Sequence, residues 1–314
     1  MKTRCRNLLV LPALLSIPLS IFPLYAFFQS DSQSDQPDFK ISTNVDLVLL
    51  DVGVKDAKGG YAANLPREAF RVEENGVQQK ITAFSNMDVP VAVGLILDDS
   101  GSMKHKRKDV ATAGLTFVDA SNPKDEVFVL DFNDRVLPGL PEDVPFTDDV
   151  SLLRTALVKH PAAGRTVLYD AIEEGLNDIR SANREKKTLI VVSDGGDTAS
   201  SRTLAQVMQA IEASDVTVYT IGIYDEDDPD NNPDVLRRIA HVSGGECFLL
   251  KNAEDIIPTS KKIAEDIRKR YTIGYVPERG SGAALRKIKV TAASPDHGHL
   301  LVRTRTSYIN PNSK

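Results

Sequence analysis

The chain has 314 residues, which is enough for two modest domains because domains usually contain about 100 to 200 residues. Its 38 Lys and Arg residues and 44 Asp and Glu residues give a formal net charge of −6, and the lack of a basic field argues against nucleic acid as a main partner. With 41% hydrophobic residues the chain can bury a core, which excludes wholesale disorder. Two cysteines, Cys5 and Cys247, cannot build a disulfide scaffold or a four-cysteine zinc site. We interpret Cys247 as a buried strand residue.

The first segment has the order of an export signal. Three basic residues come first and an apolar run follows over residues 8–28, which is typical of secretory leaders. Residues 1–28 are therefore predicted to be a signal peptide that is cleaved after Ala26. An uncleaved membrane anchor is the alternative, since the run has about 20 residues, although three prolines interrupt it. Residues 29–38 are polar and predict a flexible linker, so we expect folded structure from Phe39.

Both ends of the remaining chain show short, alternating apolar segments that are typical of antiparallel strands. Near the N-terminus we expect strands over residues 45–54, 70–73 and 79–84, the last two joined by the turn Glu74-Asn75-Gly76. Near the C-terminus we expect strands over residues 271–276, 286–292 and 300–306. These patterns predict a β-sandwich that is built from residues 39–88 and 271–310.

Between these flanks, strands alternate with helices. Continuous apolar runs predict strands over residues 91–98, 127–132, 189–193, 216–223 and 247–250. Helical periodicity predicts helices over residues 103–120, 167–182, 204–214, 233–241 and 253–270, with Asn252 as the N-cap of the last. This alternation predicts a parallel sheet with helices on both faces, a doubly wound Rossmann-like α/β domain over residues 89–270.

Three predicted loops carry oxygen-bearing side chains to one edge of this sheet, where ligands of such folds bind. Asp98, Ser100 and Ser102 follow the first strand of the domain, Thr166 precedes its second helix, and Asp194 follows its third strand. Two carboxylates and three hydroxyls make an all-oxygen site that suits Mg²⁺, with Mn²⁺ or Ca²⁺ as alternatives. No His or Cys accompanies them to favour zinc.

Asp98, Ser100 and Ser102 match the D-x-S-x-S motif of von Willebrand factor type A domains. Thr166, in the segment GRTVLYDA, and Asp194, in SDG, resemble the second-loop and third-loop residues of that family. The resemblance covers the whole middle domain, and FRVEENG and YTIGY in the flanks resemble exported bacterial proteins of the same superfamily. It implies a metal-ion-dependent adhesion site (MIDAS), in which the hydroxyls contact the ion and the aspartates bind largely through waters. A free position on the ion would then accept a carboxylate from a partner protein.

We therefore expect an exported, non-enzymatic module that binds an acidic residue of a partner protein in adhesion or at the bacterial envelope. The alternative is a metal-retaining structural or assembly scaffold of an envelope complex. A hydrolase is less well supported, because Ser100 stands where a haloacid-dehalogenase-type phosphatase needs its second aspartate, and no nucleophile elbow, phosphate loop or zinc helix is present. The direct continuation of the helix at 253–270 into the strand at 271 suggests the hypothesis that changes at the metal site reach the β module.

Three further features receive simpler interpretations. The acidic stretch 225–232 is interpreted as a solvated loop, since it lacks the glycine and glutamate that a calcium loop needs. The basic stretch 104–108 is interpreted as an exposed helix face that can attract an acidic partner. His297 and His299 lie in a predicted turn and are not interpreted as a metal site.

Overall fold

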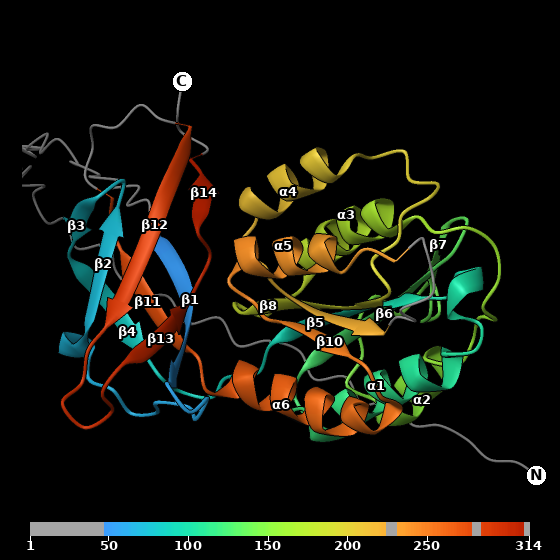
Figure 1. Cartoon of the computed structure of the whole chain (residues 1–314), viewed down its shortest axis with the longest axis horizontal. Coiled ribbons are helices and arrows are strands. Elements are labelled where there is room, and N and C mark those ends of the chain that lie inside the picture. Colours follow the sequence, from blue (N-terminus) through green and yellow to red (C-terminus); the bar gives the residue numbers. More distant parts are fainter. Residues whose placement is uncertain (1–46, 224–230, 278–283, 311–314) are drawn as a thin grey trace, which may run out of the picture. The chain divides into compact units, whose positions relative to one another are not determined.

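The computed structural model describes residues 47–223, 231–277 and 284–310 (Figure 1). The predicted signal peptide or anchor at 1–28, the linker at 29–38 and the expected start of folding at Phe39 lie outside these ranges. So does most of the acidic stretch at 225–232. Within the described ranges, no helix combines the length and the apolar character needed to cross a bilayer.

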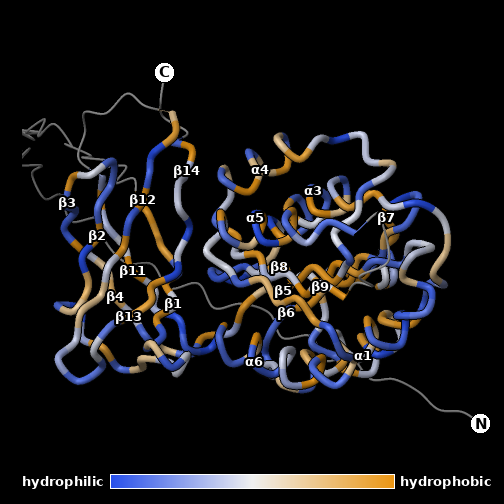
Figure 2. Tube along the Cα trace, in the orientation of Figure 1, coloured by the Kyte–Doolittle hydropathy of each residue, from blue (hydrophilic) through white to orange (hydrophobic). Residues whose placement is uncertain are grey.

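A six-stranded sheet forms the centre of the middle domain. Its strands are β5 (Ala92–Asp98), β6 (Glu126–Phe132), β7 (Val136–Pro138), β8 (Lys187–Ser193), β9 (Thr217–Ile223) and β10 (Cys247–Leu250). They lie in the order β10-β9-β8-β5-β6-β7, all parallel except the edge strand β7. Every residue of β5 and β9 is buried, as expected for strands covered on both faces. Figure 2 shows these strands as the hydrophobic centre of the domain.

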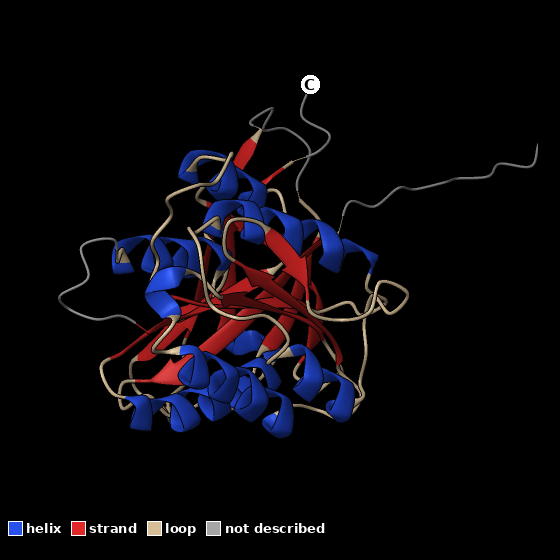
Figure 3. Ribbon diagram, turned by 90° about the vertical axis from the view of Figure 1, so that its right-hand side faces the viewer, coloured by secondary structure: helices blue, strands red, loops and turns tan. Residues whose placement is uncertain are grey.

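Helices cover both faces of this sheet. They are α1 (Arg107–Ala120), α2 (Val150–Ala156), α3 (Leu168–Asp178), α4 (Leu204–Glu212), α5 (Pro233–Ser243) and α6 (Ile256–Arg268). Helices α3, α4 and α5 lie on one face and α1, α2 and α6 on the other (Figures 1 and 3). Each helix buries one stripe; that of α3 consists of Leu168, Ala171, Ile172, Gly175 and Leu176, the spacing of an amphipathic helix. The predicted doubly wound α/β fold is confirmed.

Strands from the two flanks of the middle domain form a pair of antiparallel sheets. These strands are β1 (Val48–Asp56), β2 (Phe70–Glu74), β3 (Val77–Gln79), β4 (Ile81–Ser85), β11 (Tyr271–Tyr275), β12 (Leu285–Ala292), β13 (Leu300–Arg303) and β14 (Ser307–Ile309). One sheet has the order β13-β1-β11-β4 and the other β14-β12-β2-β3. Each sheet therefore combines strands from both flanks, and a common core of buried side chains fills the space between them, including Leu50, Val52, Val72, Tyr271 and Ile273.

The hairpin turn at Asn75 and Gly76 forms, but the predicted strand that follows it is wrong in extent. Both turn residues have positive φ, 49° and 81°, and Glu74 pairs with Val77, so the short strand β3 closes the hairpin. The predicted strand at 79–84 is interrupted at Lys80, because the chain changes sheets there and β4 pairs with β11. The predicted strand at 300–306 is also wrong in extent: β13 ends at Arg303, and the next strand, β14, begins at Ser307 in the other sheet.

Three local features differ from the sequence-based expectations. The sequence patterns do not predict strand β7 or helix α2; α2 is capped by Asp149, whose side chain accepts the backbone N–H groups of Ser151 and Leu152. Asn252 precedes a 3₁₀ turn, η4 (Ala253–Asp255), and its side chain forms no capping hydrogen bond. The α-helical part of the segment at 253–270 therefore begins only at Ile256.

Arg270, which follows α6, is buried between the middle domain and the β module. Its Nε lies 2.5 Å from Asp51 Oδ2 and its Nη1 lies 3.5 Å from Asp266 Oδ2. Its Nη2 donates to the carbonyl oxygens of Asp51 (2.9 Å) and Gly244 (3.0 Å). Burial alone would raise the pKa of Asp266, but Arg270 and Arg303 hold it below its ordinary value. The end of α6 is thus joined to strand β1 by a buried charged network.

Candidate metal centre

Backbone hydrogen bonds join the first two loops at the carboxyl end of the sheet. The N–H of Gly101 donates to the carbonyl oxygen of Gly164 (3.0 Å), and the N–H of Ala163 donates to that of Asp99 (2.8 Å). Gly101 begins the 3₁₀ turn η2 (Gly101–Met103), and an added Cβ there would lie 3.1 Å from the oxygen of Gly164. The close approach of the two loops therefore favours glycine at this position.

Three of the predicted ligand side chains meet directly. Ser100 Oγ and Ser102 Oγ lie 3.1 Å apart and share a hydrogen bond. The Ser102 hydroxyl donates to Asp194 Oδ2 at 2.6 Å. Ser100 and Asp194 are buried and Ser102 is half-buried. The first and third loops thus bring two hydroxyls and one carboxylate to a single point.

Asp98 is the last residue of β5 and is fully buried. Its Oδ1 accepts the backbone N–H of Ser100 (2.9 Å) and its Oδ2 accepts the hydroxyl of Ser193 (2.6 Å). Burial, followed by the negative charge of Asp194, raises the pKa of Asp98 to about 7. A buried carboxylate next to a second negative charge is costly to ionise, so a cation at this position would be favoured.

Thr166 is held by the loop that follows Asp194. Its N–H donates to Thr198 Oγ1 (3.0 Å), and its carbonyl oxygen accepts the N–H groups of Thr198 (2.9 Å) and Ala199 (3.0 Å). Thr166 is buried. The second loop is therefore connected to both of the others, although Thr166 is positioned through its backbone and not through a direct contact with the other four predicted ligands.

The third loop depends on a glycine directly after Asp194. Gly195 has φ +86°, and a Cβ at this residue would lie 2.3 Å from the carbonyl oxygen of Asn232. The N–H of Asn232 donates to the carbonyl oxygen of Asp194 (3.0 Å). The N–H of Gly196 donates to Asp194 Oδ1 (3.0 Å). These contacts fix the Asp194 carboxylate toward the first loop.

The donor chemistry fits a hard divalent cation. Carboxylate and hydroxyl oxygens are the donors present, and Mg²⁺ and Ca²⁺ prefer oxygen ligands. In the described part of the chain, neither Asp98 nor Asp194 forms an ion pair with Lys, Arg or His. No group of three or more His, Cys, Asp or Glu residues that could hold a metal occurs in these ranges, so a cation here would need the hydroxyls as ligands.

Sequence comparison identifies the middle domain. The family model of the von Willebrand factor type A domain matches residues 93–265, which is more than half of the chain. The chain belongs to the von Willebrand factor type A domain family. No curated protein is significantly similar to the chain in sequence.

Solved structures similar to this type A domain protein include bacterial proteins. A von Willebrand factor type A protein from Catenulispora acidiphila is 15% identical, with a TM-score of 0.52 over 85% of this chain and 75% of that one. The vWF domain of the type V pili tip protein Mfa5 from Porphyromonas gingivalis is 14% identical (TM-score 0.48, 62% of this chain and 98% of that one). An aerotolerance-related membrane protein from Bacteroides fragilis is 18% identical (TM-score 0.45, 57% and 99%). The likeness to the Catenulispora protein concerns the fold.

Some residues that support the loops of the type A domain were not identified from the sequence. Ser193 holds Asp98, as described above. Arg107 was interpreted as part of an exposed basic face, but its Nε lies 2.7 Å from Oδ1 of the buried Asp99, and its Nη2 donates to the carbonyl oxygen of Leu157 (2.9 Å). Asp131 is buried nearby, and burial followed by the charge of Asp99 raises its pKa to about 8. The only sequence signal for this cluster is Asp99, which lies inside the D-x-S-x-S motif. Its position in the motif does not indicate which basic residue it contacts.

The remaining sequence features have simpler positions. Lys104, His105 and Lys108 are exposed, as the basic-face interpretation requires. His297 and His299 are exposed in the turn between β12 and β13. Cys247 lies in the edge strand β10, where it is half-buried and not fully buried as expected, because no further strand of the described chain covers that edge.

Proposed function

We propose that this chain is an exported protein-binding module that recognises an acidic residue of a partner protein through a divalent cation. The cation would be held by Asp98, Ser100, Ser102, Thr166 and Asp194. The observation that carries this proposal is the hydrogen-bonded chain from Ser100 through Ser102 to the buried Asp194, next to a second buried carboxylate, Asp98, that accepts the backbone N–H of Ser100. In the described part of the chain no basic residue forms an ion pair with either carboxylate. Domains of this family are generally interaction modules, which agrees with this role.

The five residues divide into two roles. The hydroxyls of Ser100, Ser102 and Thr166 would contact Mg²⁺ directly, with Mn²⁺ or Ca²⁺ as alternatives, and the two aspartates would bind it largely through waters. Neutral ligands leave most of the positive charge on the ion. The ion would then be able to coordinate a carboxylate oxygen of a partner protein. The chain's own contribution is a prearranged site: Ser193 orients Asp98, and the backbone bonds among the loops fix the hydroxyls before a cation arrives.

Export is part of the proposal. The order of basic and apolar residues in the first 28 positions supports a signal peptide or an anchor. The module would then act in the periplasm, at the envelope or outside the cell, in adhesion or in another envelope interaction. No enzymatic activity is proposed.

Calorimetric titration with Mg²⁺ tests the site. We expect Asp98→Ala and Thr166→Ala each to weaken Mg²⁺ binding by at least about 10–100-fold, since the loss of a residue that only orients a metal ligand already has an effect of this size. Asp296→Ala and Thr291→Ala remove the same groups from exposed positions in the β module and should leave the affinity unchanged. Equal affinity in all five proteins would contradict the site assignment.

A pull-down from envelope material tests the partner. Capture by the wild type should be lost in EDTA and in Thr166→Ala and retained in Thr291→Ala. Captured partners should then lose binding when their contacting Asp or Glu is replaced by Asn or Gln. Association that persists without metal would instead support an assembly scaffold and contradict recognition through the ion.

A further inference from the structure

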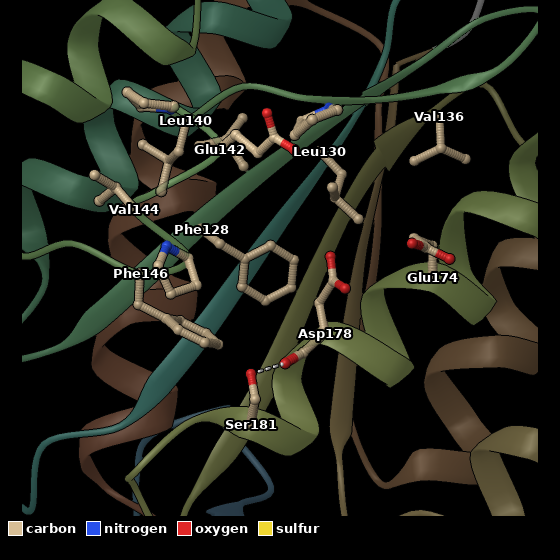
Figure 4. Close-up of a pocket in the computed structure, with 14 residues that line it drawn as sticks. Phe128, Leu130, Val136, Leu140, Glu142, Val144, Phe146, Glu174, Asp178 and Ser181 are labelled. Atoms are coloured by element: carbon tan, nitrogen blue, oxygen red, sulfur yellow. Dashed lines mark hydrogen bonds between the residues drawn. The ribbon is translucent and has the colours of Figure 1, made fainter.

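A pocket of about 320 Å³ opens beside the edge strand β7, away from the candidate metal centre. Its wall consists of strands β6 and β7, the loop from 139 to 147, and the C-terminal part of α3 with the turn η3 (Ile179–Ser181) (Figure 4). None of its 14 lining residues belongs to the five proposed metal ligands. Its volume lies at the lower end of the range for ligand sites, about 300–1,000 Å³, and suits one large side chain with its neighbour.

One side of the pocket is apolar. Phe128, from β6, packs edge-on against Phe146 of the loop, with ring centroids 5.4 Å apart and an interplanar angle of 89°. Val136, Leu140 and Val144 continue this side. Phe146, Val136 and Val144 are only partly buried, so apolar surface faces the opening. This surface favours an apolar group from outside, since covering it removes hydrocarbon from water.

The other side of the pocket is acidic. Figure 4 shows Asp178 beside the Phe128 ring, on the side away from Phe146, and Glu174 beyond it, both from α3, with Glu142 near the top of the view. None of these three acids forms an ion pair with a residue of the described ranges. Burial, followed by the negative charge of Glu174, raises the pKa of Asp178.

The chain segments around the pocket are also negatively charged. The segment from 139 to 150 contains four acidic residues, and helix α3 contains four more. Neither segment contains a Lys, Arg or His. Three of the 14 lining residues are acidic and none is basic; Arg180 of η3 is exposed and does not line the pocket. The lining therefore has an excess of negative charge. A positively charged group placed at this rim would be attracted, and a negatively charged one repelled.

We propose that this pocket docks a partner protein through a phenylalanine-sized side chain that is flanked by lysine or arginine. The apolar side chain would lie against Phe128 and Phe146, and the basic neighbour would pair with Glu174 and Asp178. The rim is formed by exposed residues such as Pro141 and Glu142, so the pocket is open to a side chain that projects from another chain. This docking site is independent of the metal centre and requires no cation.

Fluorescence anisotropy with labelled pentapeptides tests this inference on the full chain. The probe is glycine-lysine-phenylalanine-lysine-glycine; one comparison peptide has alanine in place of phenylalanine, and the other has glutamate in place of both lysines. We expect the probe to bind about tenfold more tightly than either comparison peptide. Binding should be the same in EDTA, which separates this result from the metal-dependent function.

Variants locate the binding. Glu174→Gln combined with Asp178→Asn should weaken the probe about fivefold, the effect of losing one or two partly exposed ion pairs. Glu254→Gln combined with Glu265→Gln makes the same charge change at exposed positions elsewhere and should bind the probe like the wild type. Phe146→Ala should also weaken the probe, and circular dichroism checks that it folds.

Three results would overturn the inference. The first is equal binding of the three peptides, which would show no preference for a basic apolar segment. The second is equal loss of binding in both charge-changed double variants, which would indicate general electrostatic attraction. The third is wild-type affinity for the probe in two separate proteins: the folded Phe146→Ala variant and the Glu174→Gln, Asp178→Asn double variant. This result would mean that the peptide binds outside this pocket.

Discussion

Replacing Arg270 with alanine should destabilise this protein more than any change of an exposed charge. The side chain is 1% exposed and pairs with Asp51 and Asp266. Its loss leaves the buried Asp266 with fewer basic partners and removes the donors to the carbonyl oxygens of Asp51 and Gly244. Breaking a buried ion pair from one side costs about 3–5 kcal/mol, and Arg303 Nη2, 2.7 Å from Asp266 Oδ1, remains as a partial substitute. We therefore expect a loss of about 3 kcal/mol, a large part of the usual total of about 5–15 kcal/mol.

Urea unfolding at pH 7, followed by circular dichroism, measures this loss. Arg154→Ala is the matched control, because Arg154 pairs with Asp119 at 2.6 Å while both side chains are about half exposed (50% and 51%). Exposed pairs contribute about 0–1 kcal/mol, so the control should unfold at nearly the wild-type urea concentration. Equal midpoints for the two variants would refute the reasoning that burial makes the Arg270 network important for stability.

Three further predictions concern single residues. Burial raises the pKa of Asp131 from an ordinary 3.8 to about 8 in the folded state. Between these two pH values the folded state keeps a proton that the unfolded state releases. The contribution of this group to stability is therefore fully present below pH 4 and is lost as the pH rises toward 8. Asp131→Asn should therefore gain stability relative to the wild type between pH 5 and 8 in thermal denaturation; a constant difference would contradict the assigned pKa. Gly195→Ala should weaken Mg²⁺ binding in calorimetry, because its Cβ would lie 2.3 Å from the oxygen of Asn232, and an unchanged affinity would mean that the third loop does not need this backbone. Asn75→Ala, at φ 49°, should lower the free energy of unfolding by about 1 kcal/mol, and urea denaturation that shows no loss would argue against a left-handed residue in this turn.

Patterns with a local cause predicted the fold well. Strands β5, β8 and β9 are continuous apolar runs because helices cover both of their faces, and that composition is visible in the sequence. The turn at Asn75 and Gly76 was also predicted, since these residue types tolerate positive φ. The strand after the turn was not, because the change of sheet at Lys80 is determined by pairing with β11, almost 200 positions away.

In the candidate site, too, features with a local cause are predictable from the sequence and features that depend on distant contacts are not. Residue type and loop position were enough to propose Asp98, Thr166 and Asp194 as a group. The partners of the loops were not predictable, because a contact such as Arg107 with Asp99 depends on how α1 turns against the end of β5. Because Arg107 lies among other basic residues, the sequence favours the interpretation that its side chain is exposed. Only the fold shows that Arg107 forms an ion pair with the buried Asp99.

The shared construction of the β module has a consequence for biosynthesis. Strand β1 is made early, yet its neighbours β11 and β13 are synthesised only after the entire type A domain. Domains generally fold as units in the order in which the ribosome produces them, so the type A domain can complete its core while β1 to β4 still wait for half of their sheets. The β module is consequently the last part of the protein to mature. A stop codon anywhere before position 271 would remove the partners of β1 and β4 and would leave β2 and β3 as an isolated hairpin.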